Sequence, residues 1–435
     1  MKTITIGLLG CGTVGSGVVR VLTEHAREVR ERLGVPVVVK RIAVRDEHKQ
    51  REVDVDRRLL TTDAAQVIDD PEVQVVVELV GGVEPTRGLL LRAIRAGKHV
   101  VTANKALLAA HGRELFDAAR AAGVTIAFEG SVGGGIPVIR CIREGLVANR
   151  IQSIFGIING TTNYILSEMA DRGAAYADAL KGAQEKGYAE ADPTLDVSGG
   201  DAAHKLAVLA ACAWDVPVDP DAIPTRGIDQ LAAVDVENAR QLGFVVKLLG
   251  IARLGEAGLS LSVHPTLVPH RHVLASVPGA FNAIYINGDP IGPLLLYGRG
   301  AGSGPTASAV VADLMEVGRD LVSGGVGRVP LPFGPGDEQR PQLAPADRFR
   351  SAFYLRFSAF DKPGVLARIA GALGAQGVSI SAVVQKEHRA GEAVPIVVMT
   401  HECERRAVHA AVADIDRGEG VAAPTVVLHA ENLAS

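Results

Sequence analysis

The sequence is poor in several features that mark particular classes of protein. Its 435 residues include four cysteines and one tryptophan, and only 4% of them are aromatic. No basic tract favours a nucleic acid or an anionic membrane as a partner, and the formal net charge is −4. No apolar run reaches the roughly 18 residues that a membrane span needs. We therefore expect neither a nucleic-acid-binding protein nor a membrane protein.

The cysteines and the first residues point to the cytoplasm. Cys11, Cys141, Cys212 and Cys403 are scattered without the spacing of a metal site, so we expect reduced thiols. The chain runs directly into the apolar segment Thr3–Leu9, without the charged start and cleavage site of a secretory leader.

The remaining composition favours a large α/β protein. The length predicts two or three domains. A hydrophobic content of 47% is ample for buried cores, and 49 glycines suit glycine-rich loops and tight packing of helices on sheets.

Residues 1–130 alternate between strand and helix patterns, which predicts a parallel, doubly wound sheet of the Rossmann type. The expected strands are 3–9, 36–44, 73–80, 99–101 and 124–128. The expected helices run to about Arg32 and over 85–96 and 107–122.

Residues 131–302 follow a different order, typical of an α+β domain with one open sheet, to which the resemblance given below assigns catalysis and dimerisation. Helices are expected at 164–170, 177–186 and 201–214, and strands at 259–263 and 283–286. A glycine-rich loop, Gly298–Thr306, then opens a helix over 303–323 that we expect to pack back on the first domain.

The last third of the chain begins with a predicted linker at 328–350, where prolines and charges accumulate. Residues 351–435 then show the order βαββαβ, with expected strands at 352–359, 378–384, 394–400 and 425–429 and helices at 365–375 and 405–415. This order predicts a ferredoxin-like domain.

A glycine motif at the end of the first strand indicates a dinucleotide site. In this strand-to-helix context Gly10 allows the tight turn, Gly12 admits the pyrophosphate and Gly15 permits close packing of helix and strand. The anion would rest on the helix N-terminus. The alternative is a glycine-rich turn without a ligand.

Two charged positions bear on the cofactor. Arg45 and Asp46 follow the second strand, where an arginine pairs with a 2′-phosphate and an acid with a ribose hydroxyl. Arg45 comes first, which favours NADP while NAD is tolerated. Lys105, at the end of another strand, fits a contact with cofactor or substrate and equally well an ordinary helix start.

The most informative cluster lies between Gly187 and Lys205. It contains Glu190, Asp192, Asp196 and Asp201 before the lysine, and Asp201 and Lys205 are four residues apart on one face of an expected helix. The apolar run that follows Lys205 buries this helix, and buried charges need partners. We interpret Lys205 as a general acid that Asp201 orients, and Glu190 and Asp196 as groups that could bind an ammonium. The alternative is a solvated ion pair on a surface helix.

A third glycine-rich turn runs from Glu129 to Pro137. Its carboxylate and exposed carbonyls could form an oxygen cage for a hard monovalent cation. From these residues alone, a plain strand-to-helix turn fits better.

Together these motifs resemble homoserine dehydrogenase of the long bacterial type, over essentially the whole chain. The resemblance rests on Gly-Cys-Gly-Thr-Val-Gly at 10–15, Thr-Ala-Asn-Lys at 102–105, Glu-Gly-Ser-Val-Gly-Gly-Gly-Ile-Pro at 129–137, Asn-Gly-Thr-Thr-Asn-Tyr at 159–164 and the cluster at 187–205. Several independent motifs in one order are more specific than any one of them.

The resemblance implies an NAD(P)-dependent enzyme that interconverts L-aspartate 4-semialdehyde and L-homoserine. It implies that Lys205 donates a proton to the developing alkoxide and that Lys105 lies where the nicotinamide meets the substrate. The substrate-binding residues would be Glu190, Asp201, Asp196 and Gly187. Thr13, Val14 and Gly302 would line the cofactor, and Glu129 with the carbonyls of Val132, Gly134 and Ile136 would hold a sodium or potassium ion.

The terminal domain resembles an ACT domain, through Asp361-Lys362-Pro363-Gly364 and Gly377-Val-Ser-Ile-Ser. This implies feedback control by L-threonine, with ACT domains paired between the subunits of a homodimer or homotetramer. Two rival functions are a semialdehyde dehydrogenase with a nucleophilic cysteine and a sensor without catalysis that binds a nucleotide and an amino acid.

Overall fold

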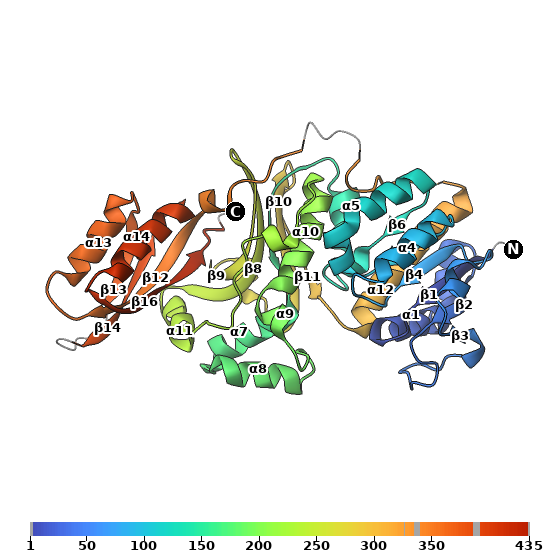
Figure 1. The fold of residues 1–435 in the computed structure, drawn as a ribbon, viewed down its shortest axis with the longest axis horizontal. Coiled ribbons are helices and arrows are strands. Elements are labelled where there is room, and N and C mark those ends of the chain that lie inside the picture. The colour runs from blue at the N-terminus through green and yellow to red at the C-terminus, as the bar shows by residue number, and fades with distance from the viewer. Residues whose placement is uncertain (1–2, 326, 335–339, 386–391, 434–435) are drawn as a thin grey trace. The chain divides into compact units, whose positions relative to one another are not determined.

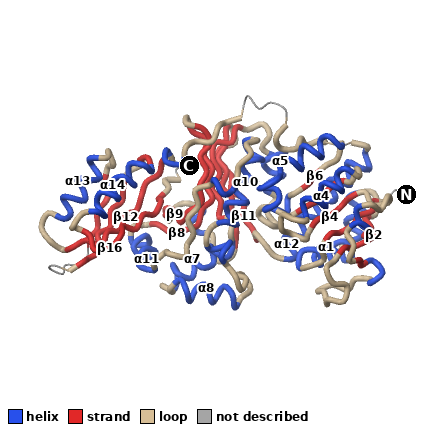
Figure 2. Tube along the Cα trace, in the orientation of Figure 1, coloured by secondary structure: helices blue, strands red, loops and turns tan. Residues whose placement is uncertain are grey.

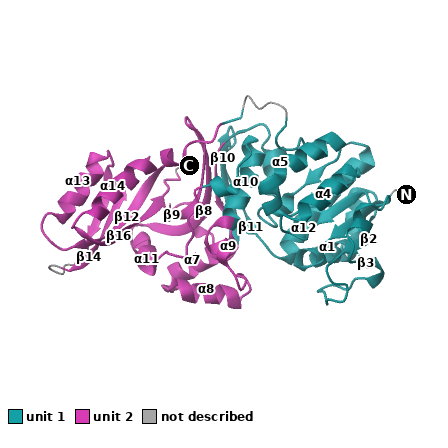
Figure 3. Ribbon diagram, in the orientation of Figure 1, with its two compact units in different colours: residues 1–151, 201–223, 281–341 teal, residues 152–200, 224–280, 342–435 magenta. Residues whose placement is uncertain are grey.

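The computed structural model describes residues 3–325, 327–334, 340–385 and 392–433 (Figure 1). The chain divides into two compact units, shown in different colours in Figure 3. Unit 1 comprises residues 1–151, 201–223 and 281–341, and unit 2 comprises 152–200, 224–280 and 342–435. None of the helices in the described part of the chain is long and apolar enough to cross a membrane.

Unit 1 contains a parallel sheet whose strand order is β3-β2-β1-β4-β5-β6. Its strands are β1 (Ile4–Leu9), β2 (Val37–Ala43), β3 (Leu60–Thr61), β4 (Val75–Glu78), β5 (His99–Thr102) and β6 (Ile126–Ala127). This is the order of the Rossmann fold, so the predicted doubly wound sheet is confirmed. The order reverses between β1 and β4, where such folds bind ligands at the carboxyl ends of the strands.

Helices alternate with these strands, as Figure 2 shows in blue and red. They are α1 (Thr13–Glu24), α2 (Ala26–Leu33), α3 (Ala65–Ile68), α4 (Thr86–Arg95) and α5 (Lys105–Ala122). The first predicted helix is interrupted at His25, where φ is −107° and ψ is 24°. The interruption lets α1 and α2 each turn apolar residues, such as Leu22 and Leu33, into the same core.

A late helix completes the core of this sheet. α12 (Ser303–Ser323) packs against α1, and its Val310 and Leu314 join Ile6 and Leu8 of β1 in one buried cluster. Burying each such side chain stabilises the fold by about 1.5–3 kcal/mol. The core of the parallel sheet therefore requires a segment from far along the chain.

Unit 1 also contains elements outside this sheet and its helices. It contains α6 (Val138–Arg140), a π-helical turn at Cys141–Gly145, α10 (Gly200–Trp214) and the antiparallel hairpin of β10 (Phe281–Asp289) and β11 (Gly292–Arg299).

Unit 2 holds a second sheet, with strands in the order β7-β8-β9-β16-β12-β14-β13. These strands are β7 (Arg150–Ile157), β8 (Phe244–Gly255), β9 (Gly258–Pro269), β16 (Val421–Ala430), β12 (Arg350–Phe360), β14 (Ala393–Thr400) and β13 (Ile380–Gln385). The helices of unit 2 are α7 (Gly160–Arg172), α8 (Tyr176–Glu185), α9 (Thr194–Val197), α11 (Ala233–Gln241), α13 (Val365–Ala375) and α14 (Arg405–Arg417).

The terminal βαββαβ order is confirmed, with a short additional strand, β15 (Cys403–Glu404), beside β12. The terminal domain continues the central sheet, because β16 pairs in parallel with β9 through His429 opposite Thr266 and Ala430 opposite Leu267. The parallel pairing of β16 had no signal in the sequence.

The predicted linker is bound to its surroundings at several points. In unit 1, Arg120 donates a hydrogen bond to the Phe333 carbonyl at 2.8 Å, and Arg340 pairs with Asp215 at 2.9 Å. In unit 2, Leu343 bridges to Leu259 of β9. Residues 335–339 of the linker lie outside the described part of the chain.

Candidate active site

The loop after β1 forms an open surface at the sheet's switch point. Gly10 has a φ of +97°, and a Cβ there would lie 2.7 Å from the Leu79 carbonyl oxygen. Nothing lies within 4 Å of the position that a Cβ on Gly12 would take. Gly10 is therefore required by the turn, whereas Gly12 leaves space for a ligand to approach the N-terminus of α1.

A second helix begins beside this loop. Gly302 precedes the first residue of α12, and the Ser303 hydroxyl donates a hydrogen bond to the Thr13 carbonyl at 2.8 Å. Thr13 and Gly302, which the resemblance places at the cofactor, are thus brought together. The N-termini of α1 and α12 both offer unpaired N–H groups and a partial positive charge, which suit an anion such as a pyrophosphate.

The end of β2 places Arg45 and Asp46 in solvent. The Asp46 carboxylate accepts the backbone N–H of His48 at 2.8 Å, which ties this acid to its own turn. Val14 is half-buried and Gly15 is buried in the first turn of α1.

Three charged side chains meet in unit 1 where α5 and α10 begin. Lys105 is the first residue of α5, and Asn104 caps this helix by accepting the Leu107 N–H at 3.1 Å. The Lys105 Nζ lies 3.1 Å from Asp201 Oδ1, and the Lys205 Nζ lies 2.6 Å from Asp201 Oδ2. One carboxylate therefore bridges two amines.

Burial decides between the two interpretations of this cluster. Asp201 is 4% exposed and Lys205 is 8% exposed, so the pair is not a solvated ion pair on a surface helix. With two lysines and one carboxylate, the group carries one net positive charge when all three are ionised. Such a group stabilises negative charge that develops on a nearby atom. It also holds an amine in a fixed position from which it can donate a proton.

His204 belongs to the same helix and lies near enough to interact with the charges of Asp201 and Lys105. It is half-buried, and burial lowers the pKa of its imidazole. Within the described residues its Nδ1 has no hydrogen-bond partner.

The other residues predicted to bind the substrate belong to unit 2. Gly187 and Glu190 are exposed on the segment between α8 and α9, and Asp196 lies within α9 and is half-buried. Asn159 donates a hydrogen bond to Asp196 at 2.7 Å and also caps α7 by accepting the Thr162 N–H. The structure thus groups the lysines with Asp201 in one unit and Asp196 with Asn159 in the other.

Asn159 was not among the predicted site residues, although it begins the motif at 159–164 on which the resemblance rests. An asparagine directly before a helical pattern indicates a cap but not a contact with a carboxylate.

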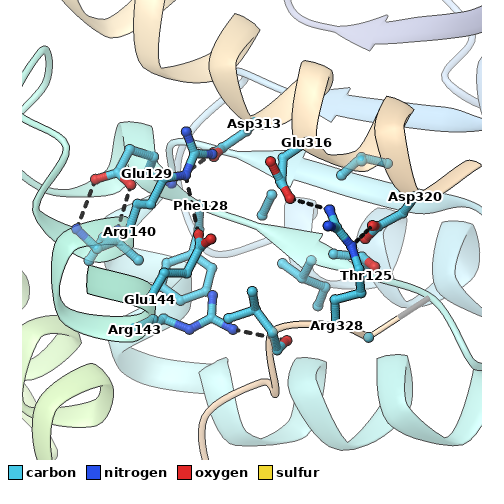
Figure 4. Close-up of a pocket in the computed structure, with 16 residues that line it drawn as sticks. Thr125, Phe128, Glu129, Arg140, Arg143, Glu144, Asp313, Glu316, Asp320 and Arg328 are labelled. Atoms are coloured by element: carbon cyan, nitrogen blue, oxygen red, sulfur yellow. Dashed lines mark hydrogen bonds and ion pairs between the residues drawn. The ribbon is translucent and has the colours of Figure 1, made fainter. Parts of the chain in front are cut away.

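Glu129 lies in a pocket of unit 1 that Figure 4 shows in close-up. Its two carboxylate oxygens accept the N–H groups of Ile139 at 2.8 Å and Arg140 at 2.7 Å, so the side chain caps α6. Its own N–H donates to Asp313 Oδ2 at 2.8 Å. Burial raises the pKa of Glu129. Burial, followed by the charge of Glu129, raises the pKa of Asp313 to about 8.

The loop after Glu129 turns back on the second glycine loop. Val132, Gly134 and Ile136 are buried, and Gly134 has a φ of +52°. A Cβ on Gly134 would lie 2.5 Å from the Gly300 carbonyl oxygen. In the described part of the chain, no three His, Cys, Asp or Glu side chains are grouped to hold a metal ion. The oxygen donors here are one carboxylate and backbone carbonyls.

Three of the four cysteines do not favour a thiol nucleophile. Burial raises the pKa of the Cys212 thiol to about 12, and it also raises the pKa of Cys141 and Cys403. A nucleophilic cysteine needs a lowered pKa, because the thiolate is the reactive form. This disfavours the rival semialdehyde dehydrogenase.

Three domain models of known families match the chain, two of them from homoserine dehydrogenase. Residues 10–129 match the NAD-binding domain of homoserine dehydrogenase, residues 137–315 match homoserine dehydrogenase itself, and residues 353–417 match the ACT domain. A homoserine dehydrogenase of Pseudomonas aeruginosa is 47% identical over 435 residues, which is 100% of each chain. That of Bacillus subtilis is 43% identical and covers 92% of each chain.

Solved structures agree with these matches. A homoserine dehydrogenase from Thiobacillus denitrificans is 49% identical, covers 100% of this chain and 99% of its own, and has a TM-score of 0.93. A hyperthermophilic archaeal homoserine dehydrogenase in complex with NADPH is 25% identical, covers 73% of this chain and 98% of its own, and has a TM-score of 0.61. The chain therefore belongs to the homoserine dehydrogenase family, as its motifs indicated, and is an oxidoreductase with an NAD-binding domain and an ACT domain.

Proposed function

We propose that this enzyme interconverts L-aspartate 4-semialdehyde and L-homoserine, preferring NADP and tolerating NAD, with Lys205 as the proton donor. The observation that carries the proposal is the buried carboxylate of Asp201 between the amines of Lys105 and Lys205. A site for carbonyl reduction needs a positioned acid at the oxygen and positive charge around it.

The glycine loops support cofactor binding. Gly12 leaves open space at the start of α1, and the loop before α12 is held against Thr13. When bound, the nicotinamide supplies a hydride to the aldehyde carbon, or accepts one from homoserine. Gly10, Gly12, Thr13, Val14, Gly15 and Gly302 would hold its phosphates and ribose, and Arg45 would pair with a 2′-phosphate.

The chain's own residues handle the proton. When the aldehyde carbon accepts the hydride, the π electrons of the C=O bond would move to the oxygen, and the protonated Lys205 Nζ would donate a proton to it. Asp201 holds the amine in place, and Lys105 adds positive charge at the junction of cofactor and substrate. In the reverse direction neutral Lys205 removes the hydroxyl proton. Glu190, Asp196 and Gly187 would bind the amino-acid end of the substrate.

The loop from Glu129 to Ile136 fits a sodium or potassium ion. Hard cations take oxygen ligands, and this loop offers a carboxylate with the carbonyls of Val132, Gly134 and Ile136. Each Glu129 oxygen accepts one N–H and retains a second lone pair. When bound, such an ion would supply positive charge that fixes this loop beside the second glycine loop.

We further propose that L-threonine regulates the enzyme through the ACT domain, in a homodimer or homotetramer. Titration of the purified chain with threonine should lower the rate and show saturable binding. An unchanged rate without binding would leave the terminal domain with a structural role only.

The central experiment supplies purified protein with homoserine and NADP, or NAD, and follows the absorbance of the reduced cofactor. We expect turnover with both and a higher kcat/KM with NADP. The absence of a signal with either cofactor would refute the enzymatic proposal. It would favour the alternative, a sensor without catalysis that keeps the glycine loop and the ACT domain.

A further inference from the structure

A buried carboxylate outside the predicted site lies at the same edge of the nucleotide-binding sheet. Glu78 is the last residue of β4 and has an exposed fraction of 0%. Its Oε1 accepts the backbone N–H groups of Val80 at 2.8 Å and Gly81 at 2.9 Å, and its Oε2 accepts the Thr102 hydroxyl at 2.6 Å. Three donors offset the cost of burying this charge.

The first set of these bonds holds the loop after β4, residues 79–82. This loop lies against the first glycine motif, because a Cβ on Gly10 would lie 2.7 Å from the Leu79 carbonyl oxygen. Val80, Gly81 and Gly82 are exposed. Glu78 therefore fixes an accessible loop at the switch point, where a nucleotide is expected.

The hydrogen bond between Glu78 and Thr102 connects Glu78 to the start of α5, where Lys105 lies. Thr102 donates to Glu78 and accepts the Asn104 N–H at 3.0 Å. Asn104 in turn caps α5 and donates to the Gly82 carbonyl at 2.7 Å, which ties α5 to the same loop. The next residue is Lys105, whose Nζ reaches Asp201.

We propose that Glu78 is a positioning residue for this reaction. Its carboxylate fixes the loop 79–82 and, through Thr102 and Asn104, the first turn of α5, and so holds the Lys105 amine against Asp201. This inference rests on the roles proposed above for Lys105 and Lys205. It goes beyond them because Glu78 and Thr102 touch neither lysine in the structure.

Substitution of Thr102 distinguishes the bonds of Glu78 to the loop 79–82 from its link through Thr102 to α5. Thr102→Val keeps the shape of the side chain but removes the hydroxyl, so Glu78 and the Asn104 N–H both lose their bond to residue 102. Glu78 still holds Val80 and Gly81, and Asn104 still donates to the Gly82 carbonyl. We expect kcat to fall by roughly 10²-fold, the loss that a misplacement of about 1 Å can cause. The KM for the cofactor should change little. Thr102→Ser keeps the hydroxyl and should restore kcat.

A matched control exists in the same sheet. Thr61 ends β3, is buried, and its hydroxyl accepts the N–H of Asp63 two residues later, as Thr102 does with Asn104. Thr61→Val should leave kcat and its pH profile unchanged. An equal loss in Thr61→Val and Thr102→Val would overturn the proposal, because the effect would then belong to the sheet in general.

Substitution of Glu78 tests its bonds to the loop 79–82 and its link to α5 together. Glu78→Ala should lower kcat and also weaken cofactor binding, measured directly by the fluorescence of the bound reduced nucleotide. Glu78→Gln keeps one acceptor oxygen for the loop but presents an amide donor to Thr102, so it should resemble Thr102→Val. In both Glu78→Gln and Thr102→Val the pH dependence of kcat should shift, since the Lys105–Asp201 contact changes.

The outcomes distinguish this inference from the function on which it rests. If the unsubstituted enzyme shows no turnover of homoserine, the proposed function fails, and cofactor binding to Glu78→Ala still tests the loop. If the enzyme is active and Thr102→Val is folded by thermal unfolding but retains the original kcat and pH profile, the positioning role of Glu78 is refuted.

Discussion

At the scale of single residues, function depends on which charges are buried together. The pairing of Asp201 with Lys205 is a consequence of helical spacing, but the addition of Lys105 is not, because this lysine comes from another helix. Lys98 provides a contrast, since it is also buried but donates to the backbone carbonyls of Asp70 and Val73. Burial of a lysine alone therefore does not mark a catalytic group.

Lys205→Ala should reduce kcat by roughly 10²–10⁴-fold, the range for a lost acid–base group. Lys205→Arg should also fail, because an arginine keeps the charge but does not release its proton. Steady-state kinetics measure both. The control is Lys98→Met, which should lower the melting temperature and leave kcat intact, and a Lys205→Ala enzyme with near-normal kcat would remove this lysine from its role.

Asp313 should make stability depend on pH. Its folded pKa is about 8 and its ordinary value is 3.8, so the folded state keeps a proton that the unfolded state releases. The stability that this proton contributes is fully present below about pH 4 and is lost as the pH rises through 8. Asp313→Asn should make stability depend less on pH. At pH 8–9 its melting temperature should be higher than that of the unsubstituted protein. The measurement is the melting temperature of each protein as a function of pH. If both melting temperatures change with pH in the same way, the expectation is contradicted.

At the scale of elements, helix N-termini organise the proposed site residues within each unit. In unit 1 the starts of α1 and α12 meet at the glycine loops, and in unit 2 Asn159 caps α7 while it holds Asp196. Caps are visible in a sequence because they depend on local hydrogen bonds. What a cap contacts beyond its own helix is a tertiary property.

Substitutions of Asn159 can separate its role as the cap of α7 from its hydrogen bond to Asp196. Asn159→Ser keeps an oxygen that accepts the Thr162 N–H but cannot reach Asp196, so it should raise the KM for homoserine with little loss of stability. Asn159→Ala should raise that KM and also cost about 1 kcal/mol of unfolding free energy. Denaturant unfolding and kinetics check both variants, and an unchanged KM in both would argue against a role for Asp196 in binding substrate.

At the scale of the whole chain, each unit is assembled from distant segments. The first sheet needs α12 for its core, and the central sheet of unit 2 is extended by the ACT domain through β16. At this junction Arg253 of β8 pairs with the buried Glu431 at 2.6 Å and lies over the Phe155 ring at 5.3 Å. The ACT domain is therefore joined to the central sheet by strand pairing and by a charge pair.

Arg253→Met should destabilise unit 2 by roughly 3–5 kcal/mol at neutral pH, since it leaves the Glu431 carboxylate buried without its partner. The loss should shrink at acidic pH, because burial already raises the pKa of Glu431 and its protonated form needs no cation. Adding Glu431→Gln to Arg253→Met should recover much of the stability. A double-mutant cycle by denaturant unfolding measures this coupling, and additive effects would show that the pair is not coupled.

The family was indicated by the resemblance of several motifs in one order. Local patterns were enough to predict the Rossmann-type sheet, the terminal βαββαβ unit and most helices. They depend on short-range physics: the period of apolar residues, the turns that glycine allows and the spacing along one helix. The pairing of Lys105 with Asp201, the hold of Asn159 on Asp196, the Glu78–Thr102 link and the parallel pairing of β16 with β9 were decided only by tertiary structure. Each joins residues far apart in the chain, and such contacts depend on how whole elements pack, which no local window of sequence contains.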